Sequence, residues 1–146
     1  EVLSTLQVFN SSPRNSLMIS PDSVGRTYTG AKSTTISQSE ITDFAAVFGE
    51  SDFSVATPTF SIRTSLDQLQ VILTDPEVGI NWERVVHGDQ KFEIHRPIVA
   101  GDVLTCDATI ESYRVAAGNE FINVKSDLRN GSEIVCTNWI TIVVRA

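Results

Sequence analysis

The sequence predicts a two-layer α+β domain in which one long helix packs against an antiparallel β-sheet. Apolar and polar residues alternate strictly in the second half of the chain, which is the period of strands with one buried face. Ahead of these strands, apolar residues recur at helical spacing over about sixteen residues. The 146 residues, 41% of them hydrophobic, suffice for one buried core, so we expect a single domain over residues 1–146.

The first elements along the chain are a weak strand and a helix. Residues 26–36 are rich in Thr and Ser and form the weak strand candidate. The helix begins at Ser37, which forms a capping box with Glu40, and it ends at Gly49. Its apolar stripe consists of Ile41, Phe44, Ala45 and Phe48.

The long helix begins with Thr57 as N-cap and Pro58 in the first helical position, where the missing amide costs nothing. It ends near residue 74, before Pro76. The stripe that we expect to face the sheet consists of Ile62, Leu66, Leu69 and Leu73. A strand follows at residues 84–96, with Phe92 and Ile94 on its inner face, and it stops before Pro97.

Three further strands complete the sheet. The first two, at residues 103–113 and 120–128, have clear inner faces, formed by Leu104, Cys106, Ala108, Ile110, Ile122, Val124 and Leu128. The links between strands contain Gly118-Asn119 and Asn130-Gly131, which suit tight hairpins because these residues tolerate positive φ. The last strand, residues 133–145, is apolar on both faces, so we expect it to be covered on both sides.

The apolar stripe of the long helix must be buried, and the sheet is the surface available for it. If the sheet curls around the helix, the result is a hot-dog fold. Such a layer has long edge strands, and pairing two copies edge to edge protects them, so we expect a dimer.

The charge and cysteine content exclude several functional classes. Eleven Lys and Arg against eighteen Asp and Glu give a net charge of −7, which opposes both nucleic acid and anionic membranes. No transmembrane run or signal peptide is apparent, so we expect a cytoplasmic protein, processed or cut from a longer chain because it does not begin with Met. Cys106, on the inner face of its strand, is expected to be a buried, unreactive thiol. Cys106 and Cys136 could approach across strands, but a cytosolic chain gives the pair no reason to form a disulfide.

The stretch HGDQKFEIHRPIVAGD, residues 87–102, resembles the MaoC-like dehydratases, particularly their N-terminal, fatty-acid-synthase-type subgroup, which includes mycobacterial (3R)-hydroxyacyl-ACP dehydratase subunits. The similarity extends over residues 24–144. It implies a hot-dog protein that acts on acyl thioesters of coenzyme A or acyl carrier protein, by adding water to a double bond or removing it. We expect no cofactor and no metal.

Active members of this family carry an Asp and a His separated by four residues in the loop before the long helix, as general base and acid. In this chain the loop, GESDFSVATP at residues 49–58, contains no His and looks short beside the family. Asp52 is the weak catalytic candidate, but the residue five positions after it, where the pair would place His, is Thr57. Glu50 is the other acid in the loop, and the residue five positions after it is Val55. A lone carboxyl with a pKa of about 3.9 is a poor general acid.

The remaining candidates carry less weight. The two histidines, His87 and His95, lie on one face of their strand if no bulge intervenes, and both are expected to have packing or hydrogen-bonding roles, since a metal site would lack ligands. Trp139 is a candidate for an interface, and Arg96 for a phosphate contact. By the resemblance, the residues expected to bind substrate are Thr57, Thr59, Phe60 and Arg63.

The favoured hypothesis is a hydratase or dehydratase subunit that lacks the catalytic pair and that shapes the acyl tunnel or stabilises a catalytic hot-dog partner. Two alternatives remain open. One is an active dehydratase or acyl-CoA thioesterase that uses Asp52, and the other is a non-enzymatic homodimer that binds acyl chains.

Overall fold

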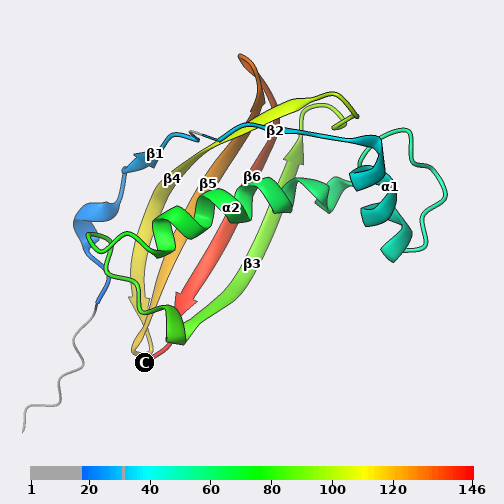
Figure 1. The fold of residues 1–146 in the computed structure, drawn as a ribbon. Coiled ribbons are helices and arrows are strands. Elements are labelled where there is room, and N and C mark those ends of the chain that lie inside the picture. The colour runs from blue at the N-terminus through cyan, green and yellow to red at the C-terminus, as the bar shows by residue number, and fades with distance from the viewer. Residues whose placement is uncertain (1–17, 31) are drawn as a thin grey trace, which may run out of the picture.

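The structure, a computed structural model, describes residues 18–30 and 32–146. Figure 1 shows one long helix lying across a face of a twisted antiparallel sheet, as the sequence predicts. The elements in chain order are η1 (Pro21–Ser23), β1 (Thr27–Tyr28), β2 (Thr34–Thr35), α1 (Gln38–Val47), η2 (Pro58–Ser61), α2 (Ile62–Leu73), η3 (Trp82–Arg84), β3 (Val85–Ile94), β4 (Val103–Ala116), β5 (Asn119–Asn130) and β6 (Glu133–Val144).

The sheet has the strand order β1-β4-β5-β6-β3, and β2 also pairs with β4. All of these pairings are antiparallel. The weak strand candidate at residues 26–36 is thus two short strands, β1 and β2, on the margin of β4. At the opposite margin, β3 pairs with β6 on one side, and no described strand pairs with its other side.

The inner face of the sheet confirms the predicted alternation in β4 and β5. The predicted side chains are all buried there, namely Leu104, Cys106, Ala108, Ile110, Ile122, Val124 and Leu128. Both hairpins are tight, with positive φ at Ala117 and Gly118 in the first and at Gly131 in the second. On the edge strand β3, by contrast, Phe92 is only half-buried and Ile94 is exposed.

The outer face of β6 differs from the sequence prediction. Trp139, Thr141 and Val143 are half-buried, and no layer of described residues covers them. The ammonium group of Lys91, on β3, lies 4.4 Å from the centre of the Trp139 ring and partly shields it. The prediction that this strand is covered on both sides is therefore wrong for the single chain.

The long helix occupies residues 58–73, because the 3-10 turn η2 leads directly into α2. This agrees with the predicted helix, but the buried stripe differs. Leu69 and Leu73 face the core as expected, together with Ile72, whereas Leu66 is 42% exposed. Two small polar residues, Ser61 and Ser65, take the buried positions on the first turns. The helix can therefore approach the sheet closely at its N-terminal end.

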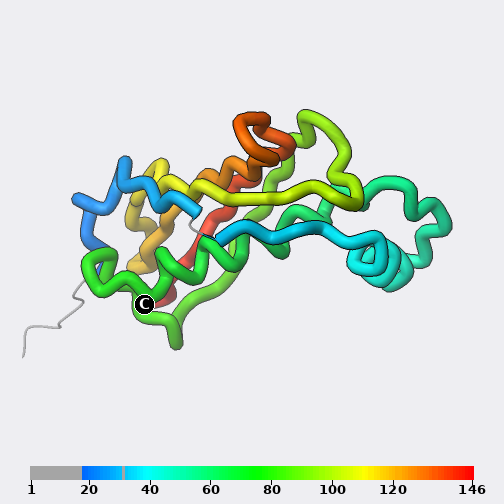
Figure 2. The backbone as a smooth tube through the Cα atoms, turned by 45° about the horizontal axis from the view of Figure 1, so that its top comes forward, coloured from blue at the N-terminus to red at the C-terminus, as the bar shows by residue number. Residues whose placement is uncertain are grey.

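The short helix α1 begins with the predicted capping box, in which both bonds between Ser37 and Glu40 are formed. Its residues Ile41 and Ala45 are buried against the core, but Phe48, predicted on the same stripe, is 61% exposed. Figures 1 and 2 agree that α1 and the loop after it project beyond the body of the sheet, so little of the sheet lies under the last turn of α1. No helix in the described part of the chain is long and apolar enough to span a bilayer.

Candidate functional site

The loop between α1 and α2 contains the catalytic candidate Asp52 in an exposed turn. The carboxylate of Asp52 accepts hydrogen bonds from the hydroxyl of Ser54 at 2.6 Å and from the backbone N–H of Ser54 at 2.9 Å. These bonds lower the pKa of Asp52, and the hydroxyl makes the larger contribution. The carboxyl is therefore ionised at neutral pH and cannot donate a proton efficiently. Its observed role is to hold the turn.

The two histidines do not complement Asp52. A β-bulge between His87 and Asp89 shifts the register of β3. His87 therefore lies opposite Ile142, on the side of the sheet that faces α2, whereas the Nε2 atom of His95 lies 3.2 Å from the hydroxyl of Thr137 on the outer side. The condition for a shared face, the absence of a bulge, is not met. Among the described residues, neither imidazole is hydrogen-bonded to Asp52.

Thr57 stands at the start of the long helix but does not cap it with its side chain. Its hydroxyl is buried and has no hydrogen-bond partner among the described residues. The residue lines a cavity of about 250 Å³ whose other walls are apolar, formed by Val55, Ala56, Pro58, Ile94, Pro97 and Ile98. Thr59, the next candidate, is exposed. The predicted cap is thus replaced by a free hydroxyl at an apolar cavity.

Phe60 and Arg63 lie together on the other side of the helix entrance. Phe60 is only 2% exposed, and its ring packs edge-on against Phe44 with 5.4 Å between the ring centres. The guanidinium of Arg63 lies 5.1 Å from the centre of the Phe60 ring and donates to Glu40 at 3.1 Å. Phe60 is consequently a core residue, and Arg63 is a half-exposed cation above it.

Two hollows open beside Arg63. One, of about 150 Å³, is lined by Thr34, Ile36, Glu40, Phe60, Arg63, Thr64 and Asp67. The other, of about 310 Å³, is lined by Glu40, Asp43, Phe44 and Arg63. The structure thus brings together Phe60 and Arg63 on one side of the helix entrance, while Thr57 faces a separate cavity.

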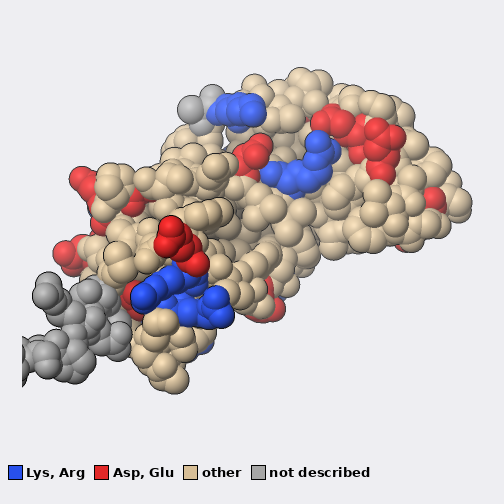
Figure 3. All heavy atoms as spheres, turned by 60° about the horizontal axis from the view of Figure 1, so that its bottom comes forward, with Lys and Arg blue, Asp and Glu red and all other residues tan. Residues whose placement is uncertain are grey.

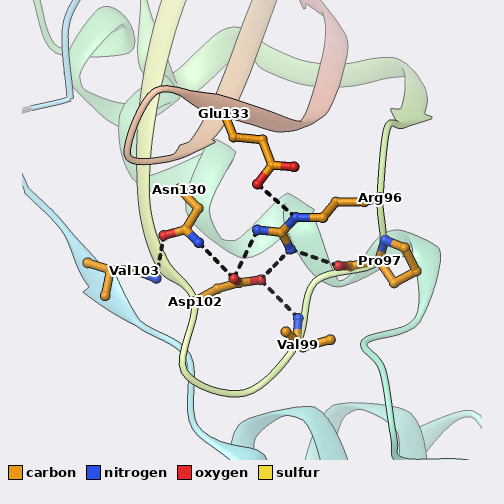
Figure 4. Close-up of polar contacts among 7 residues, drawn as sticks. All are labelled: Arg96, Pro97, Val99, Asp102, Val103, Asn130 and Glu133. Atoms are coloured by element: carbon orange, nitrogen blue, oxygen red, sulfur yellow. Dashed lines mark hydrogen bonds and ion pairs between the residues drawn. The ribbon is translucent and has the colours of Figure 1, made fainter.

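Arg96 is held within the protein rather than available for phosphate, as Figure 4 shows. Its guanidinium binds both carboxylate oxygens of Asp102, at 2.8 and 3.0 Å, and it also contacts Glu133 at 3.0 Å. The bond to Asp102 is the first cause of the raised pKa of Arg96, and the same bond lowers the pKa of Asp102. The ion pair between Arg96 of the HRP segment and Asp102 of the GD segment, called the clamp below, therefore connects the two ends of the loop between β3 and β4.

A buried polar cluster beneath the first turns of the long helix was not predicted. The side chain of Asn138, on β6, accepts from Ser61 at 3.2 Å and donates to Ser65 at 3.0 Å. Cys136 donates its thiol hydrogen to Asn138 at 3.0 Å. The cluster fixes the position of the helix entrance on the sheet. The signal in the sequence was the polar Asn138 on the inner face of an otherwise apolar strand.

A further cavity, of about 360 Å³, lies between α2 and the segment that contains β1 and β2. Cys106 contributes to its wall, but burial raises the pKa of this thiol to about 12, so it is not a nucleophile at neutral pH. Both thiols are free, and Cys106 is buried as predicted; Cys136 is buried as well. Within residues 18–30 and 32–146 no cluster of three metal-ligating side chains occurs.

Charged residues are scattered over the surface. On the face drawn in Figure 3, Lys and Arg side chains form small separate groups with Asp or Glu close to most of them. This face therefore offers no broad basic area for a polyanion.

Comparison with known proteins shows the family to which the chain belongs. The model of the FAS1-like dehydratase domain region matches residues 22–138. A UPF0336 protein of Streptomyces coelicolor is 32% identical over 139 residues, which covers 84% of this chain and 93% of that protein.

Solved structures share the fold at low sequence identity. A chain of the HadBC complex of Mycobacterium tuberculosis, a 3R-hydroxyacyl-ACP dehydratase, superposes with a TM-score of 0.75 at 20% identity, covering 84% of this chain and 97% of that chain. A chain of the ChsH1–ChsH2 complex, also from Mycobacterium tuberculosis, superposes with a TM-score of 0.59 at 15% identity, covering 82% of this chain and 83% of that chain. These superpositions confirm the predicted hot-dog fold.

Proposed function

Since the chain belongs to the family of FAS1-like dehydratase domain regions, within the MaoC-like hot-dog proteins, we propose that it is a non-catalytic subunit of a cytoplasmic acyl-thioester hydratase or dehydratase. In this proposal it shapes the acyl site and stabilises a second hot-dog subunit, which supplies the Asp and His pair. The substrate is an (R)-3-hydroxyacyl or enoyl thioester of coenzyme A or acyl carrier protein.

The observation that carries this proposal is the chemistry of the helix-entrance loop. Hydration and dehydration need one group that takes a proton and one that returns it. The loop offers Asp52, which is exposed and whose pKa lies below its ordinary value, and neither histidine of the chain bonds to it. A family fold with this loop favours a supporting role over a catalytic one.

Substrate contacts are proposed at the helix entrance, from the four residues expected to bind it. The unpartnered hydroxyl of Thr57 can bond to a polar atom of a thioester whose acyl chain fills the adjoining apolar cavity. Thr59 is exposed next to it. Arg63, above the Phe60 ring, is a cation that a carrier phosphate could approach at the cost of its exposed bond to Glu40.

The proposed partner is supported by the edge strand β3. Among the described strands, none pairs with one side of β3, although β3 is ten residues long. Long open edges are normally covered. Because two structures with this fold come from the HadBC and ChsH1–ChsH2 complexes, we propose that a related subunit covers β3 here.

Hydration of crotonyl-CoA, followed by loss of enoyl absorbance, tests this function. We expect no turnover above background by the purified chain, and turnover once a MaoC-like subunit with an intact Asp-x4-His loop is added. Asp52→Asn should leave the activity of the mixture unchanged, because the carboxyl only holds its turn. Turnover by the chain alone that is abolished by Asp52→Asn would contradict the proposal, as would steady release of free thiol from acyl-CoA, which would indicate a thioesterase.

A further inference from the structure

The hairpin between β5 and β6 contains a peptide bond with its own chemistry. Asn130, the last residue of β5, pairs with Glu133, so the turn itself consists of Gly131 and Ser132. Gly131 has a φ of +60°, and beyond its chain neighbours no described atom lies within 4 Å of the position that a Cβ would take. Asn130 is also the only asparagine in the sequence that is followed by glycine.

An Asn-Gly bond can lose ammonia without an enzyme. The backbone nitrogen of the glycine attacks the side-chain carbonyl carbon of the asparagine, its proton passes to solvent, and ammonia leaves as a five-membered succinimide ring closes. Water then adds to one of the two ring carbonyls and breaks its C–N bond, which gives aspartate or isoaspartate. Glycine favours the attack because it has no side chain and the widest choice of backbone dihedrals. The net change is water taken up, ammonia released and a negative charge gained at neutral pH.

In the folded chain the amide of Asn130 is held at both of its polar ends, as Figure 4 shows. Its Nδ2 atom donates to the Oδ1 atom of Asp102 at 3.0 Å, and its Oδ1 atom accepts from the backbone N–H of Val103 at 3.3 Å. The amide must leave both bonds to turn toward the nitrogen of Gly131. The reaction therefore waits for a local opening of these contacts.

The product would place a carboxylate where the clamp has no cation to spare. Arg96 is already bonded to both carboxylate oxygens of Asp102, to Glu133 and to the carbonyl of Pro97. Asp102 is only 5% exposed, so solvent screens its charge poorly. A carboxylate at residue 130 would replace an amide donor 3.0 Å from Asp102 by a like charge. The two carboxylates would repel each other and weaken the clamp.

The loop that the clamp connects also forms part of the apolar cavity at the helix entrance. Pro97 and Ile98 belong to this loop and line the cavity. The backbone N–H of Val99 donates to Asp102 at 3.0 Å, and the carbonyl of Ile98 accepts from the N–H of Ala56 at 2.8 Å. A weaker clamp therefore loosens one wall of this cavity.

We propose that Asn130 is a deamidation site at which the folded loop delays the reaction and the product weakens the clamp. Because the lost ammonia is not regained, each event leaves a chain whose loop between β3 and β4 is permanently looser. This inference goes beyond the proposed function, since it concerns a covalent change within the chain and requires neither a partner subunit nor a thioester.

Peptide mass spectrometry of chain incubated at physiological temperature and mildly alkaline pH measures the reaction at each asparagine. Asn119, in the other hairpin, is the matched control because it is followed by Glu120. We expect Asn130 to react about tenfold or more faster than Asn119. In chain unfolded by urea Asn130 should react about tenfold faster still, and Asp102→Asn, which weakens the bonds that hold the amide, should give an intermediate rate.

The effect of the product is measured on a variant with the same charge. Asn130→Asp is compared with Asn119→Asp, which adds that charge where the amide bonds only to the backbone of Ala117 and Ala146. Asn130→Asp should speed hydrogen exchange of the Val99 N–H about tenfold or more, and Asn119→Asp should change it less than about twofold.

Asn130→Ser separates the charge from the lost bonds, because it removes the amide without adding a carboxylate. Its effect on exchange at Val99 should be smaller than that of Asn130→Asp. An equal effect of the two variants would show that repulsion from Asp102 does not act, and the proposed weakening of the clamp by charge would be overturned.

Three further results would overturn the inference. The first is a rate at Asn130 no higher than at Asn119, and the second is an equal rate at Asn130 in folded and unfolded chain. The third is unchanged exchange at Val99 in Asn130→Asp. None of these measurements uses a second subunit or a substrate, so the proposed function stands or falls separately.

Discussion

The central sheet and the helix entrance of this molecule differ in how complete they are within one chain. On β4 and β5 the predicted inner-face side chains are buried, and on β6 the polar Asn138 is bonded to the helix above it. At the entrance, Phe48 is 61% exposed, and the hydroxyl of Thr57 is buried without a partner among the described residues. The difference indicates that apolar side chains are buried more completely over the central sheet than at the helix entrance.

Phe60, a buried core residue, and Phe48, at the exposed end of α1, give the largest expected contrast in packing. Phe60→Ala should lower the free energy of unfolding by about 4 kcal/mol, because the ring is buried and leaves a cavity. Phe48→Ala should cost less than about 1 kcal/mol, since the ring is mostly exposed and packs chiefly on Phe44. Urea denaturation of both variants measures the difference. Equal losses would show that the entrance is as tightly packed as the core.

The clamp between Arg96 and Asp102 gives the next largest effect. Asp102→Asn should cost about 3 kcal/mol, because it leaves Arg96 without its main counter-charge. Since the folded state lowers the pKa of Asp102, its contribution is present at neutral pH and is lost as the pH falls below about 4 toward the folded pKa.

The pH dependence provides the check on this clamp. Thermal unfolding between pH 7 and pH 3 should show the wild type and Asp102→Asn converging at the acid end. Parallel curves over that range would mean that the Asp102 charge does not stabilise the fold.

Arg63 gives the smallest expected effect on stability. Arg63→Met breaks a partly exposed bond to Glu40 and a contact with the Phe60 ring, so it should cost about 0.5 kcal/mol. In the complex with a catalytic subunit, the same variant should raise KM for an acyl-CoA substrate and leave kcat unchanged, if the cation meets the carrier phosphate. A lower kcat at constant KM would place Arg63 outside the binding site.

Periodicity predicted the sheet and the helices because burial in those regions follows the spacing of apolar residues. It failed where polar side chains take buried positions. The predicted sheet-facing stripe contained only large apolar residues, but Ser61 and Ser65 also face the sheet. The Ser61 hydroxyl bonds to Asn138, and the Ser65 hydroxyl bonds to Asn138 and to the backbone of Ile62. It also failed at Phe48, because helical spacing indicates a face of α1 but not whether the sheet extends beneath it.

The candidate site was predictable only in part. The sequence alone shows that the helix-entrance loop contains no His. The structure adds that Asp52 lies in an exposed turn, where it bonds to Ser54. The role of Arg96 was not predictable, because its partners Asp102 and Glu133 come together only when the loops at that end of the sheet fold.

The most direct measurement is a titration of this chain into a fixed amount of a MaoC-like subunit that bears the Asp and His pair, with the rate of enoyl-CoA hydration as readout. Our account predicts that the rate rises and saturates at about one chain per catalytic subunit, the stoichiometry of a two-subunit hot-dog complex. A rate that stays constant throughout the titration, or an equal rate from this chain alone, would contradict it.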